Sequence, residues 1–324
     1  MAVVGGASLL AREIRSVFEN EHPVPRLQLI ATAPIESAED ASDDEDSAAM
    51  PPLSVESLKG ARVAFLAGSA ASSRRTLKMI PRGGPRLVDL TAALEDQTDA
   101  CLRAPSAEPQ GLPARPARIH VIAHPAAIAL TTLLARLGEA AAIRKAVVQI
   151  FKPASERGQA GLTELQKQTI AVLSFKKLPK DVFDAQLAFS LLASYGEEAP
   201  EPLETIEQRV ERHVASLLTH WPGIPMPSLR LVQAPVFHGH TLSIWVEFER
   251  NPGAAALSAH LEAAGLDVRR DDPPTNTGCA GQNGLSVGAI TEDRNNPRAC
   301  WLWLVADNLR LAAENAVAVA KDLA

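Results

Sequence analysis

Cysteines and closely spaced histidines, which could act as nucleophiles or metal ligands, are few in this sequence. The three cysteines, Cys101, Cys279 and Cys300, are too few and too scattered for a disulfide framework or a zinc site. His238 and His240 stand two residues apart beside an expected strand, where they share a face, but no third ligand stands nearby in the sequence. We therefore expect no metal site. His240 is either a hydrogen-bonded structural residue or an acid–base group, and a position between two strands is more typical of the first.

The first predicted strand is followed by a glycine-containing turn of the kind that binds dinucleotide phosphates. Such turns need glycine because backbone N–H groups approach the pyrophosphate at the start of the next helix. Gly5 and Gly6 occupy the turn, but Ser8 and Ala11 stand at the later positions of the fingerprint. Ala11 is small enough for the helix to pack closely on the strand, whereas Ser8 places a Cβ atom where the backbone should meet phosphate. This degraded fingerprint is weak evidence for NAD or NADP binding.

Short apolar runs alternate with helical patterns through the first third of the chain. Segment 9–18 is amphipathic, and Ser8 could cap a helix there. Strands separated by connections of helix length favour a parallel, doubly wound sheet, which places its ligands beyond the carboxyl ends of the strands. The predicted strands cover residues 2–4, 26–31, 61–66, 86–89 and 118–123.

Strands dominate the second half of the chain, as is typical of an α+β domain with a mixed sheet. The long strands expected at 229–236 and 241–248 follow one another directly and are expected to pair. We expect an α/β protein in which residues 1–124 form a Rossmann-like domain, residues 125–307 form the second domain, and a helix over 308–323 completes the first. The other elements expected in the second half are strands at 147–152, 285–290 and 300–305, and helices at 163–173 and 254–264.

Composition limits the classes of function. The chain has 324 residues, 46% hydrophobic and 22% charged, which is an ordinary globular balance. The net charge of −6 is local, because seven acids fall between residues 36 and 46 and the rest of the chain stands at about +1. No basic stripe with aromatic residues indicates a nucleic-acid partner, and no apolar run of about 18 residues indicates a membrane span. The cysteine usage and the lack of a leader pattern predict a cytoplasmic protein.

The order of segments through nearly the whole chain resembles the aspartate-semialdehyde dehydrogenase family. The similarity is carried by the N-terminal turn, by the strand end and turn at 152–161, by APVFHGH at 234–240 and by WLVADNLR at 303–310. Within this family, the segments FDAQLAF at 183–189 and QAPVF at 233–237 look most like the Usg-type paralogues.

The resemblance implies reductive dephosphorylation of an acyl phosphate, or its reverse, through a thioester on a cysteine at the start of a helix, where the dipole favours a thiolate. Ala127 stands at the position of that cysteine, so no thioester can form. Lys152 stands at the position of a glutamine that orients the substrate. Gln233 stands at that of an arginine that clamps its carboxylate, which a neutral amide cannot replace. Glu95 stands at that of a phosphate-holding arginine, and only His240, the expected acid–base group, is retained.

The resemblance also implies NADP or NAD as cofactor and a homodimer formed through the second domain. The acidic run would repel the 2′-phosphate of NADP, while Glu36 could bond a ribose hydroxyl as an acid does in NAD sites. Two hypotheses for the function follow. The first is a catalytically inactive family member that serves as a scaffold, a sensor or a partner of an active paralogue. The second is an enzyme with a different reaction in the same cleft, using His240 and Lys152. The altered positions favour the first.

Overall fold

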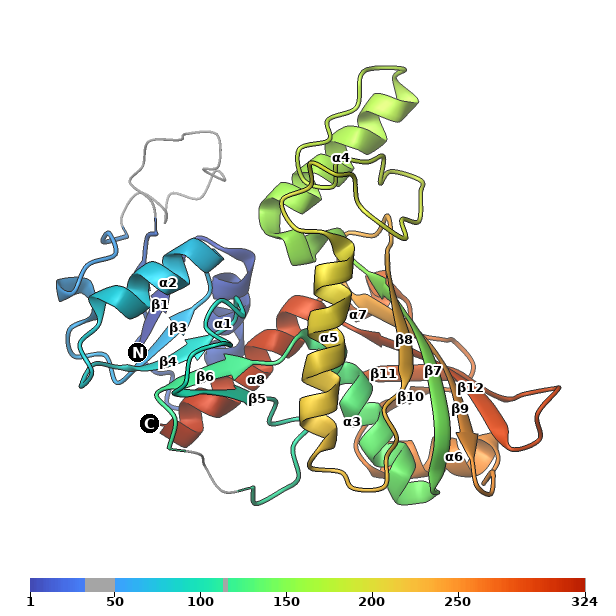
Figure 1. Cartoon of the computed structure of the whole chain (residues 1–324). Coiled ribbons are helices and arrows are strands. Elements are labelled where there is room, and N and C mark those ends of the chain that lie inside the picture. Colours follow the sequence, from blue (N-terminus) through green and yellow to red (C-terminus); the bar gives the residue numbers. More distant parts are fainter. Residues whose placement is uncertain (33–49, 113–115, 324) are drawn as a thin grey trace. The chain divides into compact units, whose positions relative to one another are not determined.

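The computed structural model describes residues 1–32, 50–112 and 116–323 (Figure 1). The chain forms two compact units. Unit 1 consists of Met1–Pro105, Gln110–Ala123 and Ala312–Ala324, and unit 2 of Ser106–Pro109 and His124–Leu311. The acidic run at 36–46, which includes Glu36, lies outside the described residues. Among the described ranges, no helix is long and apolar enough to cross a membrane.

The two units divide the chain slightly differently from the predicted domains. The last helix, α8 (Asn308–Leu323), begins in unit 2 and ends in unit 1. Residues 106–109 belong to unit 2, because the Trp221 Nε1–H donates to Ala107 O at 2.8 Å and the Thr132 hydroxyl donates to Ser106 O at 3.3 Å. Contacts with distant residues therefore decide where this short segment belongs.

Unit 1 is built on a parallel six-stranded sheet with the strand order β2-β1-β3-β4-β6-β5. Helices α1 (Leu9–Glu19) and α2 (Ala70–Met79) connect strands of this sheet. Aliphatic side chains, mostly leucine and isoleucine, form a buried cluster in this unit. The strands are β1 (Ala2–Val4), β2 (Gln28–Ile30), β3 (Val63–Leu66), β4 (Arg86–Asp89), β5 (Ala100–Arg103) and β6 (Ile119–Ile122), and a 3-10 turn, η2 (Glu56–Leu58), precedes β3.

Strand β5 is an edge strand that the sequence analysis missed. It pairs with β6 in parallel, with Cys101 opposite His120. Its four residues alternate between half-buried and buried positions, and a proline-rich segment follows them. A sequence of four residues that is both polar and apolar gives only a weak indication of a strand. The conformation of β5 is therefore set by its pairing with β6.

Unit 2 contains a mixed six-stranded sheet with the strand order β10-β11-β12-β9-β7-β8 (Figure 1). Together the two sheets confirm the predicted fold class. Helix α5 and strand β10 were not predicted. The strands are β7 (Ile143–Lys152), β8 (Ser228–Gln233), β9 (His240–Phe248), β10 (Asp267–Arg269), β11 (Ser286–Glu292) and β12 (Ala299–Ala306), and the helices are α3 (Pro125–Ala140), α4 (Gly158–Leu173), α5 (Leu203–Leu218), α6 (Ala254–Ala263) and α7 (Asn276–Cys279).

The predicted pairing of the strands at 229–236 and 241–248 is wrong. β8 and β9 both pair with β7, which lies between them, β8 in parallel and β9 in antiparallel orientation. The connection from Gln233 to His240 is longer than a tight hairpin loop and contains Pro235, which has no N–H to donate to a ladder. Its backbone bonds instead to the segment that follows β7.

The two faces of the mixed sheet differ in burial. Val148 and Ile244 lie opposite one another on β7 and β9 and are fully buried, and helices α3, α5 and α6 contact this sheet. The opposite face carries the residues that stand next to these in the strands. A row crosses β7, β9 and β12 there, formed by Val147, Trp245 and Trp301. Val147 is 40% and Trp301 44% exposed. We call these three residues the exposed row.

Candidate functional site

Glu156 is the centre of a cluster of polar side chains in unit 2. It lies in η3 (Ala154–Arg157), a short 3-10 turn after β7, and its side chain is 15% exposed. Each of its carboxylate oxygens faces a different histidine, with His124 Nε2 at 3.0 Å from Oε1 and His240 Nε2 at 2.8 Å from Oε2. Lys152 Nζ lies 3.3 Å from Oε1. One carboxylate is thus surrounded by three nitrogen groups.

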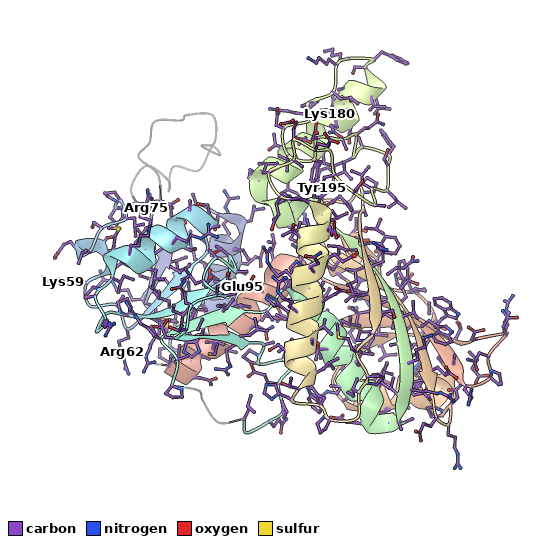
Figure 2. The ribbon with its side chains drawn as sticks, in the orientation of Figure 1. Lys59, Arg62, Arg75, Glu95, Lys180 and Tyr195 are labelled. Carbon is purple, nitrogen blue, oxygen red and sulfur yellow. The ribbon has the colours of Figure 1, made fainter. Side chains whose placement is uncertain are left out.

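The sheet register brings Lys152 and Gln233 together. They are partners at the carboxyl ends of the parallel strands β7 and β8, the edge at which such sheets gather functional groups. The Tyr195 hydroxyl donates to Gln233 Oε1 at 2.6 Å, and Lys152 Nζ lies 3.4 Å from the same oxygen. Tyr195 is the single tyrosine of the chain and lies in the segment between α4 and α5, near the start of α5 (Figure 2).

Hydrogen bonds hold the segment after β7 against the segment before β9. The Ser155 N–H donates to Phe237 O at 2.9 Å. Asn308 Oδ1 accepts from the Ser155 hydroxyl at 3.0 Å and from the Gly239 N–H at 3.1 Å. Gly239 has a φ of +82°, which glycine adopts without strain. These bonds place the start of β9 beside η3.

His124 is the N-cap of α3, and Ala127 is the third residue of that helix. His124 Nδ1 accepts from the Ala126 N–H at 3.2 Å, so Nε2 carries the hydrogen that faces Glu156. The His124 backbone N–H donates to His213 Nδ1 at 2.9 Å. The cap therefore fixes the tautomer in which His124 is a donor to the carboxylate.

Burial and neighbouring charges set the protonation states of the cluster. Burial raises the pKa of Glu156, but His124 and Lys152, with hydrogen bonds from both histidines, hold that pKa well below its ordinary value. Burial lowers the pKa of His124. It also lowers the pKa of Lys152, an effect that Glu156 opposes and Arg157 strengthens. In this cluster the neighbours of Glu156 favour its ionised form, whereas burial disfavours the charged forms of His124 and Lys152.

Ligand atoms of His124, Glu156 and His240 lie within 4.8 Å of one another, a spacing that could hold a metal ion. The sequence analysis weighed only His238 beside His240 and missed the other two groups, which are distant in the sequence. Two features oppose a metal. His124 Nε2 presents a hydrogen instead of a lone pair, and a dication near the Lys152 ammonium would leave an excess of buried positive charge. We therefore still expect no metal here.

The position of the expected nucleophile, Ala127, offers no reactive group. Its side chain is fully buried in the first turn of α3. The three cysteines, all buried and none in a disulfide, lie in other elements: Cys101 in β5 of unit 1, Cys279 in α7 and Cys300 in β12. The helix N-terminus thus carries no thiol.

The two positions that should hold anionic groups are filled by residues unsuited to that task. Gln233 is buried, and its Nε2 already donates to the backbone oxygens of Lys152 at 2.9 Å and Ala234 at 3.1 Å. Both amide hydrogens are used, so none remains for a substrate carboxylate. Glu95 lies in the turn after β4 in unit 1 (Figure 2), and a carboxylate there would repel a phosphate.

The turn after β1 keeps its glycines but uses its N–H groups internally. Gly5 has a φ of +89°, and a Cβ atom there would lie 2.4 Å from Gly68 Cα, so the turn requires glycine. The N–H groups of Gly5 and Gly6 donate to the last carbonyl of β2. Ser8 Oγ accepts from the N–H of the buried Ala11 at 3.1 Å and so caps α1. The N–H groups of Gly5, Gly6 and Ala11 are thus already bonded within unit 1.

We expect titration with NADPH to give no saturable fluorescence enhancement at concentrations that saturate an active aspartate-semialdehyde dehydrogenase measured in parallel. The reason is that N–H donors of the turn are already bonded within unit 1. Arg75 on α2 donates to Thr32 O just beyond β2 and offers a control (Figure 2). Saturable binding that Arg75→Glu weakens would contradict this expectation and show that unit 1 still holds the dinucleotide.

Three members of the cluster escaped the sequence analysis: His124, Glu156 and Tyr195. A signal existed for His124, because it precedes a proline in the pattern of an N-cap followed by proline at the first helical position. Glu156 stands within the segment 152–161 that carried the resemblance. The structure unites the predicted Lys152, Gln233 and His240 in this one cluster, while the glycine turn belongs to unit 1.

Solved structures share this architecture of a parallel-sheet unit and a mixed-sheet unit. An aspartate semialdehyde dehydrogenase II complexed with ASA, from Vibrio cholerae, matches with a TM-score of 0.83 over 99% of this chain and 96% of its own, at 23% identity. A probable aspartate-semialdehyde dehydrogenase from Pseudomonas aeruginosa matches with the same TM-score over 99% of this chain and 97% of its own, at 30% identity. The fold is therefore that of the aspartate-semialdehyde dehydrogenases.

Sequence comparison gives the family. The family model described as "Semialdehyde dehydrogenase, dimerisation domain" matches residues 134–311. A USG-1 protein homolog from Pseudomonas aeruginosa is 31% identical over 98% of this chain and 95% of its own length. The aspartate-semialdehyde dehydrogenase of Streptomyces akiyoshiensis is 26% identical over 100% of this chain and 98% of its own. The chain belongs to the semialdehyde dehydrogenase family.

Proposed function

We propose that this family member does not catalyse the thioester reaction and serves as a homodimeric scaffold, sensor or partner subunit. The observation that carries the proposal is the buried methyl group of Ala127 in the first turn of α3. Thioester formation needs a nucleophilic thiolate, which a helix N-terminus would stabilise, and alanine supplies none.

The groups that should hold the substrate support the same conclusion. Gln233 has no free amide hydrogen for a carboxylate, and Glu95 has the wrong charge for a phosphate. The Lys152 ammonium is paired with Glu156. Because nucleophile and binding groups act as a unit in catalysis, restoring one of them is not expected to restore the reaction.

The proposed homodimer would use the exposed row of the mixed sheet. The matched family model is that of a dimerisation domain. It covers residues 134–311, a range that includes all six strands of the mixed sheet. Two of the three residues of the row are large apolar side chains with more than a third of their surface exposed. A second copy of the chain would cover this apolar surface.

The first experiment is a phosphate-dependent assay of NADP and NAD reduction with aspartate semialdehyde, using the purified protein and an Ala127→Cys variant. We expect turnover by both to lie roughly 10⁴-fold or more below that of an active relative, because the anion-holding groups are lost together with the thiol. Turnover by the unmodified protein that disappears in a His240→Ala variant would overturn the proposal. Turnover that survives this substitution would come from a contaminant.

One observation favours a second function, an enzyme that uses His240 in another reaction. His240 is 1% exposed, its Nε2 faces Glu156, and its Nδ1 has no hydrogen-bond partner among the described residues. A histidine held through one ring nitrogen can exchange a proton through the other. Such an enzyme would retain a dependence on His240 in a reaction that needs no phosphate.

A further inference from the structure

The Lys152 amine is the most weakly bonded member of the cluster around Glu156. Its Nζ lies 3.3 Å from Glu156 Oε1, 3.4 Å from Gln233 Oε1 and 3.5 Å from the Tyr195 hydroxyl. These separations exceed the usual 2.9 Å of a charge-assisted bond, whereas its neighbours bond closely to one another, with Tyr195 to Gln233 at 2.6 Å and His240 to Glu156 at 2.8 Å. The hydrogen bonds between the other members of the cluster are therefore shorter than those that the Lys152 ammonium makes.

We propose that Lys152 captures a small aldehyde by forming an imine between its Nζ and the carbonyl carbon. This activity goes beyond the proposed function, because it needs neither a thiol nor a dinucleotide. The Lys152 side chain is fully buried and lies within contact of a carboxylate and a phenol, the kinds of group that move protons in imine formation. An aldehyde is the fitting ligand because a neutral amine adds readily to it.

The reaction balances without an oxidant or a reductant. The Lys152 ammonium first gives a proton to water, and the neutral Nζ then adds to the carbonyl carbon. The carbonyl oxygen receives the two remaining protons of the nitrogen, one after the other, through the Glu156 carboxylate. The first proton makes the oxygen a hydroxyl group, and the second lets it leave as water while the carbon–nitrogen double bond forms. One amine and one aldehyde thus give one imine and one water, and hydrolysis reverses the step.

Burial favours the reactive form of Lys152 and also limits its access. Loss of hydration lowers the pKa of the amine, and the Arg157 guanidinium nearby adds to this effect. Glu156, whose carboxylate is the nearest partner of Nζ, is 15% exposed, whereas the Lys152 side chain is fully buried. Capture of an aldehyde therefore requires a change in the Glu156 side-chain torsions, in which the amine loses its anionic partner.

The test is reductive trapping on the full-length protein. The protein is incubated with succinic semialdehyde, and separately with aspartate semialdehyde, in the presence of cyanoborohydride, and the adducts are mapped by peptide mass spectrometry. We expect Lys152 to be labelled at least tenfold faster than Lys145, an exposed lysine on the same strand. A Lys145→Arg variant is expected to label as the unmodified protein does. Tyr195→Phe is expected to slow the labelling of Lys152 several-fold, since it removes the hydroxyl that lies 3.5 Å from Nζ and holds Gln233 Oε1 beside the amine.

Three outcomes would overturn the inference: adducts spread over the exposed lysines, Lys152 labelled no faster than Lys145, or Lys152 labelled only after unfolding in urea. A Lys152→Met variant should lose the adduct, and its circular dichroism shows whether it is folded. If that variant does not fold, the map of the unmodified protein and the Tyr195→Phe rate still decide. Trapping requires no NADP or NAD, so its result is separate from that of the oxidation assay.

Discussion

Replacing Glu156 with glutamine is expected to lower the free energy of unfolding of unit 2 by about 3–5 kcal/mol, because it leaves the buried Lys152 ammonium without its counterion. The glutamine also loses the charge that orders both histidines. All four tryptophans of the chain lie in unit 2, so tryptophan fluorescence during urea unfolding at pH 7 measures this unit. Glu262→Gln, which removes an exposed ion pair with Arg270, is the matched control and should change stability by less than about 1 kcal/mol.

Acid should weaken unit 2 in a way that the Glu156→Gln variant does not share. The pKa of Glu156 is depressed in the folded state, so its contribution is present above its ordinary value of 4.5 and is lost as the pH falls through the lower folded value. His124 acts in the same direction below 6.5 in both proteins, because the unfolded chain takes up a proton that the buried imidazole resists. The two proteins are therefore compared below pH 4.5, where only the unmodified protein loses the Glu156 contribution. An unchanged urea midpoint at pH 7, or equal acid sensitivity of both proteins below pH 4.5, would show that Glu156 is no counterion.

A Trp301→Glu substitution is expected to convert the proposed homodimer into monomers, raising its dissociation constant ~30-fold or more. The indole is 44% exposed and lies opposite Trp245 in the exposed row, so a carboxylate there would bring an unpaired charge into the apolar centre of the interface. Sedimentation velocity over a range of protein concentrations measures the effect.

Val55→Glu is the matched control for this substitution, because Val55 is 55% exposed but lies in unit 1. It should leave the sedimentation coefficient unchanged. A dimer that persists in Trp301→Glu at low micromolar concentration would place the interface elsewhere. A protein that is monomeric before any substitution would exclude the homodimer itself.

Elements governed by local signals were predictable from the sequence. The helix over 308–323 matches α8 in both bounds, because its alanine-rich pattern is strong and uninterrupted. The strands at 2–4 and 86–89 match β1 and β4, and Ser8 caps α1 as expected, since its hydroxyl stands one turn before the amphipathic run.

Features governed by register between distant segments were not predictable in the same way. Nothing near 229–248 in the sequence says that β7, some 80 residues earlier, lies between β8 and β9. The same holds for Glu156, whose partner His240 is 84 residues away. The resemblance located Lys152, Gln233 and His240 as separate positions. Only the folded structure shows that Lys152 and His240 share the Glu156 carboxylate and that Gln233 borders Lys152.

The divided helix α8 has a consequence for the order in which the protein folds during synthesis. Unit 1 contains the first strands of the chain but also residues from Ala312 onward, and Arg103 reaches Asp322 at 3.2 Å. At about 5–20 residues per second, the ribosome adds this last segment roughly 10–40 s after Ala123. During that interval the side chains of unit 1 that pack against the end of α8 stay exposed to solvent. The buried residues of this part of the helix include Ala313 and Val319. Unit 1 begins to be synthesised first and is completed last. A truncation near the C-terminus would therefore destabilise the N-terminal half of the chain.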